Sequence, residues 1–320
     1  MKMTSVVITA PRVATLRKEP RDTVPPRGVR VRLQGCGVCG SNLPVWDGRP
    51  WFRYPLAPGT PGHEGWGIVE AVGEEVSKVK SGDRVAMLSY HAFAECDVSP
   101  ADHVVLLPKS LDNEPFPGEA LGCAMNVFAR CDLQPKQTVA VVGLGFLGAL
   151  LVGLARNAGA HVIALGRRAS AREMARRMGA HDIIATDDYR RAVNEVKEVT
   201  RGLGCERVIE ATGFQEPLDL ASEICRERGR LIIAGYHQDG PRQVNMQSWN
   251  WRGLDVINAH ERDPEIYLEG MRAAIDAIAE GRLNPGPLYT HRFRLDQIAA
   301  ALDLLRDRPA GFMKALMIHE

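Results

Sequence analysis

The sequence has no excess of charge of either sign. Its 320 residues include 40 Lys and Arg and 39 Asp and Glu, so the formal net charge is +1. Proteins that bind nucleic acid or anionic membranes chiefly through charge carry a basic surplus. We therefore expect neither partner, and a small molecule is the expected substrate.

Long apolar runs are also missing. The longest extends from Ala149 to Ala155, far short of the ~20 residues that span a bilayer. Near the N-terminus a short apolar run ends at Pro11, too brief for a signal-peptide core. These observations predict a cytoplasmic protein without a transmembrane segment.

The cysteines do not form a disulfide framework. There are seven of them, an odd number, spread from Cys36 to Cys225. In a reducing compartment, metal binding or catalysis is the more common role for a cysteine with a function. The length of the chain, at roughly 150 residues per domain, predicts about two domains.

The pattern along the chain changes twice. Residues 1–115 contain short β-branched runs separated by Gly and Pro, typical of antiparallel strands in a small barrel-like domain. Residues 116–284 alternate apolar strands with helical stretches, which predicts a doubly wound α/β domain with a parallel sheet. Residues 285–320 read as strand, helix and strand, and we expect them to return to the first domain.

A glycine motif predicts a dinucleotide site. Gly143, Gly145 and Gly148 have the G-x-G-x-x-G spacing between a strand and a helix, with a second strand following. Such glycines permit a tight turn, backbone approach to a pyrophosphate and close packing of helix on strand. The helix N-terminus, with Phe146 and Leu147, would supply N–H groups to the phosphates.

The end of the second strand predicts which dinucleotide binds. An acidic residue there would bind the ribose diol of NAD, but this chain has Gly166, Arg167 and Arg168. Two guanidinium groups suit the 2′-phosphate of NADP(H), which we therefore expect in preference to NAD. Alternatively, the arginines only solvate a loop.

Three more segments carry a family resemblance. They are GCGVCGSN (residues 35–42), GHEGWGIVEAVG (62–73) and GEALGCAMNV (118–127). In this order, ahead of the dinucleotide motif, they resemble the zinc-dependent medium-chain dehydrogenases and reductases, the alcohol and polyol dehydrogenase family. The most specific element is GHE-xx-G-x5-G, formed by Gly62, His63, Glu64, Gly67 and Gly73. The resemblance implies a GroES-like, mainly β catalytic domain combined with a Rossmann domain.

The resemblance also implies one catalytic zinc per subunit. Its first two ligands would be Cys39 and His63, and thiolate and imidazole do suit Zn²⁺. The third ligand position falls on Glu119, while Glu64 can reach the metal as well. Either glutamate could instead support the ligands without touching the ion. The four-cysteine lobe that holds a structural zinc in many relatives is missing.

Two neighbouring positions complete the implied site. Ser41 would pass the alcohol proton toward solvent, and Ser41, Glu64 and Glu119 are the candidate catalytic residues. Asn42 replaces the acid that usually supports the histidine ligand, and we expect its amide to accept a hydrogen bond from the imidazole. Pro44 stands where a relay histidine is common.

The implied reaction is hydride transfer between NADP(H) and an alcohol or carbonyl. The candidate substrate contacts are Trp46, Glu95, His237, Asn258 and His260. The polar members of this set favour a polyol, sugar or cyclitol. Since dimers and tetramers dominate the resembled family, a homodimer or homotetramer is expected.

Two other interpretations remain open. One is a zinc-independent NADPH-dependent quinone or enone reductase, although such branches lack the Cys39 and His63 pattern. The other is a non-catalytic binding protein that retains the fold.

Overall fold

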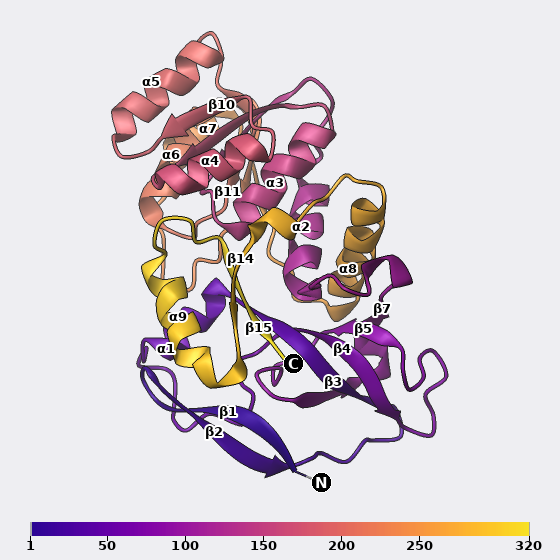
Figure 1. Ribbon diagram of the computed structural model, residues 1–320. Helices are drawn as coiled ribbons and strands as arrows, with labels where there is room; N and C mark the ends of the chain where they lie inside the picture. The colour runs from indigo at the N-terminus through magenta and orange to yellow at the C-terminus, as the bar shows by residue number, and fades with distance from the viewer. Residues whose placement is uncertain (1, 320) are drawn as a thin grey trace. The chain divides into compact units, whose positions relative to one another are not determined.

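The computed structural model describes residues 2–319, and these form two compact units (Figure 1). Unit 1 contains the chain up to Gly122, then Asp263–Ala279, and the chain from Tyr289 onward. Unit 2 contains Cys123–Arg262 and Glu280–Leu288. Each is described separately below.

One helix differs from the sequence-based division. Helix α8 (Pro264–Ala279) was expected in the dinucleotide domain at residues 116–284, but it groups with unit 1. The helix contacts strand β7 (Val104–Leu106) and the start of helix α2 (Gly118–Cys131), where a Cβ added at Gly122 would lie 3.0 Å from the Met271 nitrogen. The sequence pattern identified the helix but not its packing partner.

Unit 1 is built on a mainly antiparallel sheet of seven strands in the order β14-β15-β3-β4-β5-β7, with β6 paired to β3. Their bounds are β3 Gly28–Val38, β4 Glu64–Val72, β5 Arg84–Met87, β6 Cys96–Pro100, β7 Val104–Leu106, β14 Tyr289–Phe293 and β15 Lys314–Ile318. A separate hairpin is formed by β1 (Lys2–Ala10) and β2 (Val13–Pro20). Strand β15 pairs with β3, which brings the C-terminal strand beside residues 35–38.

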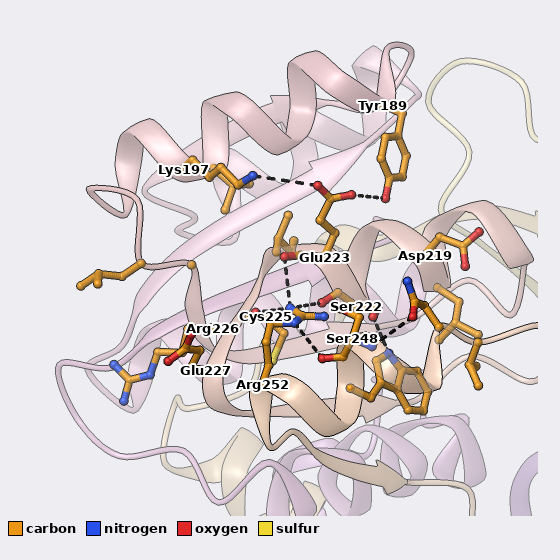
Figure 2. A pocket seen from close by; sticks show the side chains of 18 of the residues that line it. Tyr189, Lys197, Asp219, Ser222, Glu223, Cys225, Arg226, Glu227, Ser248 and Arg252 are labelled. Carbon is orange, nitrogen blue, oxygen red and sulfur yellow. Dashed lines mark hydrogen bonds and ion pairs between the residues drawn. The ribbon is translucent and has the colours of Figure 1, made fainter.

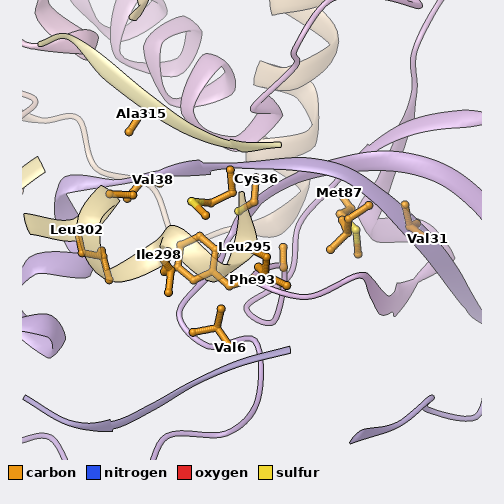
Figure 3. Packing of buried hydrophobic residues seen from close by; sticks show 14 of the residues in the cluster. Val6, Val31, Cys36, Val38, Met87, Phe93, Leu295, Ile298, Leu302 and Ala315 are labelled. Carbon is orange, nitrogen blue, oxygen red and sulfur yellow. The ribbon is translucent and has the colours of Figure 1, made fainter. Parts of the chain in front are cut away.

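The core of unit 1 joins the hairpin, the sheet and helix α9 (Ile298–Asp307). Figure 3 shows Val6 from the hairpin, Val31 from the sheet and Leu302 from α9 in one apolar cluster, around Phe93. Alternate residues of a strand point to one face of a sheet, so β3 contributes Val29, Val31 and Leu33 to this cluster.

Unit 2 is a parallel six-stranded sheet in the order β10-β9-β8-β11-β12-β13. Its strands are β8 Thr138–Val142, β9 His161–Gly166, β10 Asp182–Ala185, β11 Cys205–Glu210, β12 Cys225–Ile233 and β13 Asp255–Asn258. Its helices include α3 Phe146–Asn157, α4 Ala169–Arg177, α5 Tyr189–Val199, α6 Gln215–Ile224 and α7 Met246–Arg252. The strand order reverses between β8 and β11, the position at which open α/β sheets bind ligands.

The predicted fold class, a doubly wound parallel sheet with a mainly β domain, is confirmed. Within residues 2–319, none of the helices combines the length and apolar character needed to cross a membrane.

The unit 1 core predicts a large difference between two leucines. Leu302→Ala should lower the free energy of unfolding by about 3 kcal/mol, because it leaves a cavity in a cluster where Leu302 is fully buried. Leu106→Ala, at a strand position that is 52% exposed, should cost less than about 0.5 kcal/mol. Denaturant unfolding followed by circular dichroism measures both, and equal effects would contradict the assigned core.

Candidate functional site

Two strand ends bring the predicted metal donors together in unit 1. Cys39 directly follows β3 and His63 directly precedes β4, and these antiparallel strands pair with Gly37 opposite Glu64. The donor atoms of Cys39, His63 and Glu64 lie within 4.8 Å of one another. Both predicted first ligands and one of the two candidate third ligands therefore lie close together.

The imidazole of His63 is oriented by the backbone. Its Nδ1 lies 2.8 Å from the Pro61 carbonyl oxygen, to which it donates when protonated there. In the neutral ring with its proton on Nδ1, Nε2 carries the lone pair; this nitrogen lies 3.4 Å from Ser41 Oγ and 4.0 Å from a Glu119 oxygen. A histidine held in this way by its second nitrogen is a preorganised metal ligand.

The charge around His63 is negative. Burial lowers the pKa of His63, but the hydrogen bond and charge of Cys39, followed by the charges of Glu119 and Glu64, raise it to about 10. A thiolate, an imidazole and carboxylates are donors that zinc prefers. The residues present therefore fit a zinc ion.

Glu64 is held by a lysine that the sequence analysis did not identify. Lys314 Nζ lies 2.7 Å from Glu64 Oε1 and 2.6 Å from Oε2, and Lys314 is only 4% exposed. Burial lowers the pKa of Lys314, but the charge and hydrogen bond of Glu64, together with the charges of Cys39 and Glu119, outweigh burial and raise this pKa. A lysine within the apolar run FMKALMI was the available signal.

The position of the Glu64 carboxylate explains a glycine. A Cβ added at Gly37 would lie 1.7 Å from Glu64 Oε2, so the carboxylate packs directly on the backbone of β3. A larger residue at this position would displace the ion pair next to the metal donors.

The expected role of Asn42 is wrong. Its Oδ1 accepts a hydrogen bond from the Cys39 backbone N–H at 2.9 Å, and its Nδ2 donates to the Pro61 carbonyl at 3.1 Å. The Nδ1 atom of His63 also bonds to the Pro61 carbonyl oxygen, so the imidazole is held by the backbone and not by the Asn42 side chain. Asn42 instead ties the Cys39 loop to the His63 segment.

Cys36 is not among the grouped donors. It is fully buried, its Sγ donates to the Gly37 carbonyl at 3.4 Å, and burial raises its pKa. It lies in the apolar cluster shown in Figure 3, which indicates a packing role.

In unit 2 the three motif glycines have three different surroundings. Gly143 has a φ of +104°, which favours glycine, and a Cβ added at Gly148 would lie 1.9 Å from the Gly143 oxygen. An added Cβ at Gly145 would meet nothing within 4 Å. The loop before α3 therefore has a tight turn at Gly143, a close helix contact at Gly148 and an open backbone at Gly145. Phe146 and Leu147 form the start of α3, as predicted.

The arginines after β9 lie where the sequence placed them. Gly166 ends β9, Arg167 is exposed, and Arg168 occupies the N-cap position of α4. Arg172, which the sequence analysis missed, donates from Nη1 to the carbonyls of Gly166 at 3.0 Å and Arg167 at 2.5 Å. Its position four residues after Arg168 on one helix was the available signal.

Two predicted substrate contacts in unit 1 do not join the metal donors. Trp46 is fully buried and donates from Nε1 to Asp303 at 2.9 Å, so its assignment as a cleft residue is wrong. The short helix α1 (Leu43–Trp46) packs against α9, which covers its indole. Glu95 accepts a hydrogen bond from the Thr4 backbone N–H at 2.8 Å. Tyr90 was missed: it is 69% exposed, and its ring centre lies 6.2 Å from that of His63.

The three predicted contacts in unit 2 follow the carboxyl ends of β12 and β13. Asn258 is exposed at the end of β13, and His260 stacks on Tyr236 with ring centres 5.2 Å apart. His237 differs, because its Nε2 lies 3.1 Å from the buried carboxylate of Glu210. His237 is therefore held by the protein itself.

A cavity of about 950 Å³ in unit 2 contains none of the predicted site residues (Figure 2). It lies among α5, α6 and α7, and its central carboxylate, Glu223, accepts from Tyr189 at 2.6 Å and lies 3.9 Å from Lys197. Arg252 donates to the carbonyls of Ser222 and Cys225 at the end of α6. These polar groups bind one another, and the dinucleotide motif lies elsewhere.

Comparisons with known proteins agree with this arrangement. Residues 25–148 match the model of the alcohol dehydrogenase GroES-like domain, and residues 147–279 match that of the zinc-binding dehydrogenase domain. The D-arabitol-phosphate dehydrogenase of Enterococcus avium is 26% identical over 310 residues, covering 86% of each chain.

Solved structures share the fold. A protein of Sinorhizobium meliloti 1021 assigned as a zinc-binding dehydrogenase and bound to NADP has a TM-score of 0.84 at 24% identity, covering 100% of both chains. A short chain alcohol dehydrogenase of Escherichia coli CFT073 complexed with NADH has a TM-score of 0.88 at 23% identity, covering 99% of both.

The glycine loop predicts opposite outcomes for two alanine substitutions. Gly145→Ala should leave the thermal unfolding midpoint unchanged and weaken NADPH binding at least about 10-fold, because the new methyl group occupies the open space before α3. Gly148→Ala should destabilise the protein by about 1–3 kcal/mol, since its Cβ meets the Gly143 oxygen. Calorimetry and NADPH fluorescence test both, and unchanged NADPH affinity in Gly145→Ala would refute the site.

Proposed function

Because the chain belongs to the zinc-type medium-chain dehydrogenase/reductase family and is an oxidoreductase, we propose that it transfers a hydride between NADP(H) and an alcohol/carbonyl pair with one zinc ion per subunit. The observation that carries the proposal is the convergence of the Cys39, His63 and Glu64 donor atoms within 4.8 Å. The short apolar runs of the sequence lead us to expect the cytoplasm as its location, and the family resemblance implies a homodimer or homotetramer.

The metal donors have distinct roles in the proposed reaction. Cys39 and His63 would hold the ion, together with an oxygen of either Glu64 or Glu119. When bound, zinc supplies positive charge that stabilises negative charge on a substrate oxygen. The Lys314 ammonium offsets the charge of the Glu64 carboxylate and so reduces the repulsion among the negatively charged donors.

Proton transfer is assigned to Ser41. Its hydroxyl lies 3.4 Å from His63 Nε2, beside the position where a ligand of the metal would bind. A hydroxyl can accept the alcohol proton and donate its own to water. Pro44 has no side-chain donor or acceptor, so in the proposed route the proton leaves through water or a second substrate hydroxyl.

The cofactor preference follows from the loop geometry and the arginines. The open backbone at Gly145 and the N-terminus of α3 would bind the pyrophosphate. Arg167 and Arg168 would bind the 2′-phosphate, while Arg172 fixes the carbonyls of this segment. Of the two similar structures described above, one holds NADP and one NADH, so the preference rests on these side chains.

The proposed substrate is a hydroxyl-rich alcohol such as a polyol, sugar or cyclitol. Support comes from Glu119 at the third ligand position of the resembled pattern and from similarity to a protein named as a D-arabitol-phosphate dehydrogenase. Tyr90, exposed beside His63, offers an aromatic face to the carbon skeleton of such a substrate. Glu95 and His237 are bound within the protein and are poorer candidates than the sequence suggested.

The metal site predicts different outcomes for two neighbouring cysteines. Cys39→Ala should reduce bound zinc from about one to about zero per chain and lower turnover at least about 100-fold, while NADPH still binds. Cys36→Ala removes a thiol three residues away that packs in the core, and it should retain zinc. Elemental analysis and NADPH absorbance give the readouts.

The outcome also separates the competing functions. Full zinc content and activity in Cys39→Ala would refute the metal assignment. An active wild-type enzyme without zinc would favour the quinone or enone reductase, and no turnover on any alcohol, carbonyl or quinone would favour a binding protein.

The arginines predict a change in cofactor choice. Arg167→Gln combined with Arg168→Gln should lower the NADPH/NADH ratio of kcat/KM at least about 10-fold, because the charge-assisted contacts to the 2′-phosphate are lost. Arg177→Gln, an exposed arginine at the end of α4, is the control and should leave the ratio unchanged. A double variant with an unchanged ratio would show that these arginines only solvate the loop.

A further inference from the structure

A buried carboxylate lies behind the dinucleotide loop without a role in the reaction. We propose that Glu210, acting through His237 and Arg242, is a positioning residue that fixes the loop for the pyrophosphate half of the cofactor. This inference rests on the proposed function, since it concerns the same dinucleotide site. Glu210 ends β11, directly beside the reversal of strand order, and its side chain is fully buried.

Glu210 fixes the turn that follows it. Its Oε1 accepts hydrogen bonds from the backbone N–H of Thr212 at 2.6 Å and of Gly213 at 3.0 Å, and from the Thr212 hydroxyl. The backbone carbonyl of Glu210 accepts from the N–H groups of Ala234 and Gly235, both at 2.8 Å. One residue thus joins the ends of β11 and β12.

This turn lies against the first motif glycine. A Cβ added at Gly143 would lie 2.3 Å from Thr212 Cγ2 and 3.2 Å from the Ala211 carbonyl carbon. On its other side the turn is equally close, since a Cβ at Gly213 would lie 2.4 Å from the Tyr236 oxygen. With no free space on either side, displacement of the Thr212 turn displaces the loop at Gly143.

The second oxygen of Glu210 requires one tautomer of His237. Arg242 donates from Nε to His237 Nδ1 at 2.8 Å, which leaves the imidazole proton on Nε2, 3.1 Å from Glu210 Oε2. Arg242 also donates from Nη2 to the Gly213 carbonyl at 2.7 Å and pairs with Asp239. The segment after β12 is therefore bound to the Thr212 turn through His237, which contacts Glu210, and through Arg242, which contacts both His237 and Gly213.

A carboxylate is needed at position 210 for a specific reason. A glutamine at position 210 can still accept the hydrogen bonds of the Thr212 turn with its one oxygen. Its NH2 group then faces the Nε2–H of His237, so that two donors meet without an acceptor. The histidine cannot exchange its proton to Nδ1, because Arg242 donates there. Glu210→Gln should therefore loosen the turn although the two side chains have nearly the same shape.

The test compares two ligands. Glu210→Gln should weaken NADPH binding about 10-fold, and should leave binding of adenosine 2′-monophosphate, which has no pyrophosphate, within about 2-fold of wild type. A purely structural role would weaken both. Titration calorimetry and competition against NADPH measure these constants, and thermal unfolding confirms that the variant is folded.

Further variants test the chain of contacts. Arg242→Gln, at a side chain that is 15% exposed, should also weaken NADPH and spare adenosine 2′-monophosphate. The double variant Glu210→Gln/Arg242→Gln should bind NADPH no worse than Glu210→Gln alone, since His237 is then free to change tautomer. Additive losses would overturn the linkage through His237.

A control variant and the wild-type protein separate failure of this inference from failure of the proposed function. Asp97→Asn changes a buried acid in unit 1, and it should lower stability without changing NADPH affinity. If wild type binds NADPH and Glu210→Gln binds it equally well, only this inference fails. If wild type binds no NADPH, the proposed function fails with it.

Discussion

The buried ion pair between Lys314 and Glu64 is the interaction on which the group of proposed metal donors in unit 1 depends. Glu64 is the residue after His63, and its carboxylate lies against the backbone of Gly37, two residues before Cys39. Removing one partner of a buried pair typically costs about 3–5 kcal/mol, because the other charge stays uncompensated. The pair thus stabilises the place where the end of β3, next to Cys39, meets the start of β4, next to His63.

The same pair limits the charge of the site. Thiolate and carboxylate groups that converge without a cation repel one another, and the raised pKa of His63 reports that field. Lys314 offsets part of this negative charge through its ion pair with Glu64. In unit 2 the constraint is steric instead: Gly143 and Gly148 lie where no Cβ fits, and Glu210 keeps the neighbouring turn in place.

Local sequence patterns were sufficient to predict the strands of unit 2 and the two motif regions. The apolar strands of unit 2, the glycine spacing and the segments around Cys39 and His63 all occur as predicted, because each depends on neighbours in sequence. The start of α4 differs from its local pattern: Ser170 and Glu173 have the spacing of a capping box with Ser170 as the N-cap, yet the observed N-cap is Arg168, two residues earlier.

The remaining features depend on contacts between distant segments. Lys314 meets Glu64 because β15 pairs with β3, and helix α8 joins unit 1 through contacts with β7 and with the start of α2. Trp46 looked like a cleft residue by its place after the zinc loop, but Asp303, far along the chain, buries its indole. Glu210 belongs to no sequence motif. Its role becomes visible only in the structure, where the backbone N–H groups of Thr212 and Gly213, the Thr212 hydroxyl and His237 Nε2 all contact its carboxylate.

X-ray absorption at the zinc edge tests the central claim most directly. The account predicts one zinc per chain, bound by one sulfur at about 2.3 Å and by nitrogen and oxygen donors at about 2.0–2.2 Å. A site without zinc, or one with two or more sulfur ligands, would contradict the assignment of Cys39, His63 and a glutamate as the metal donors.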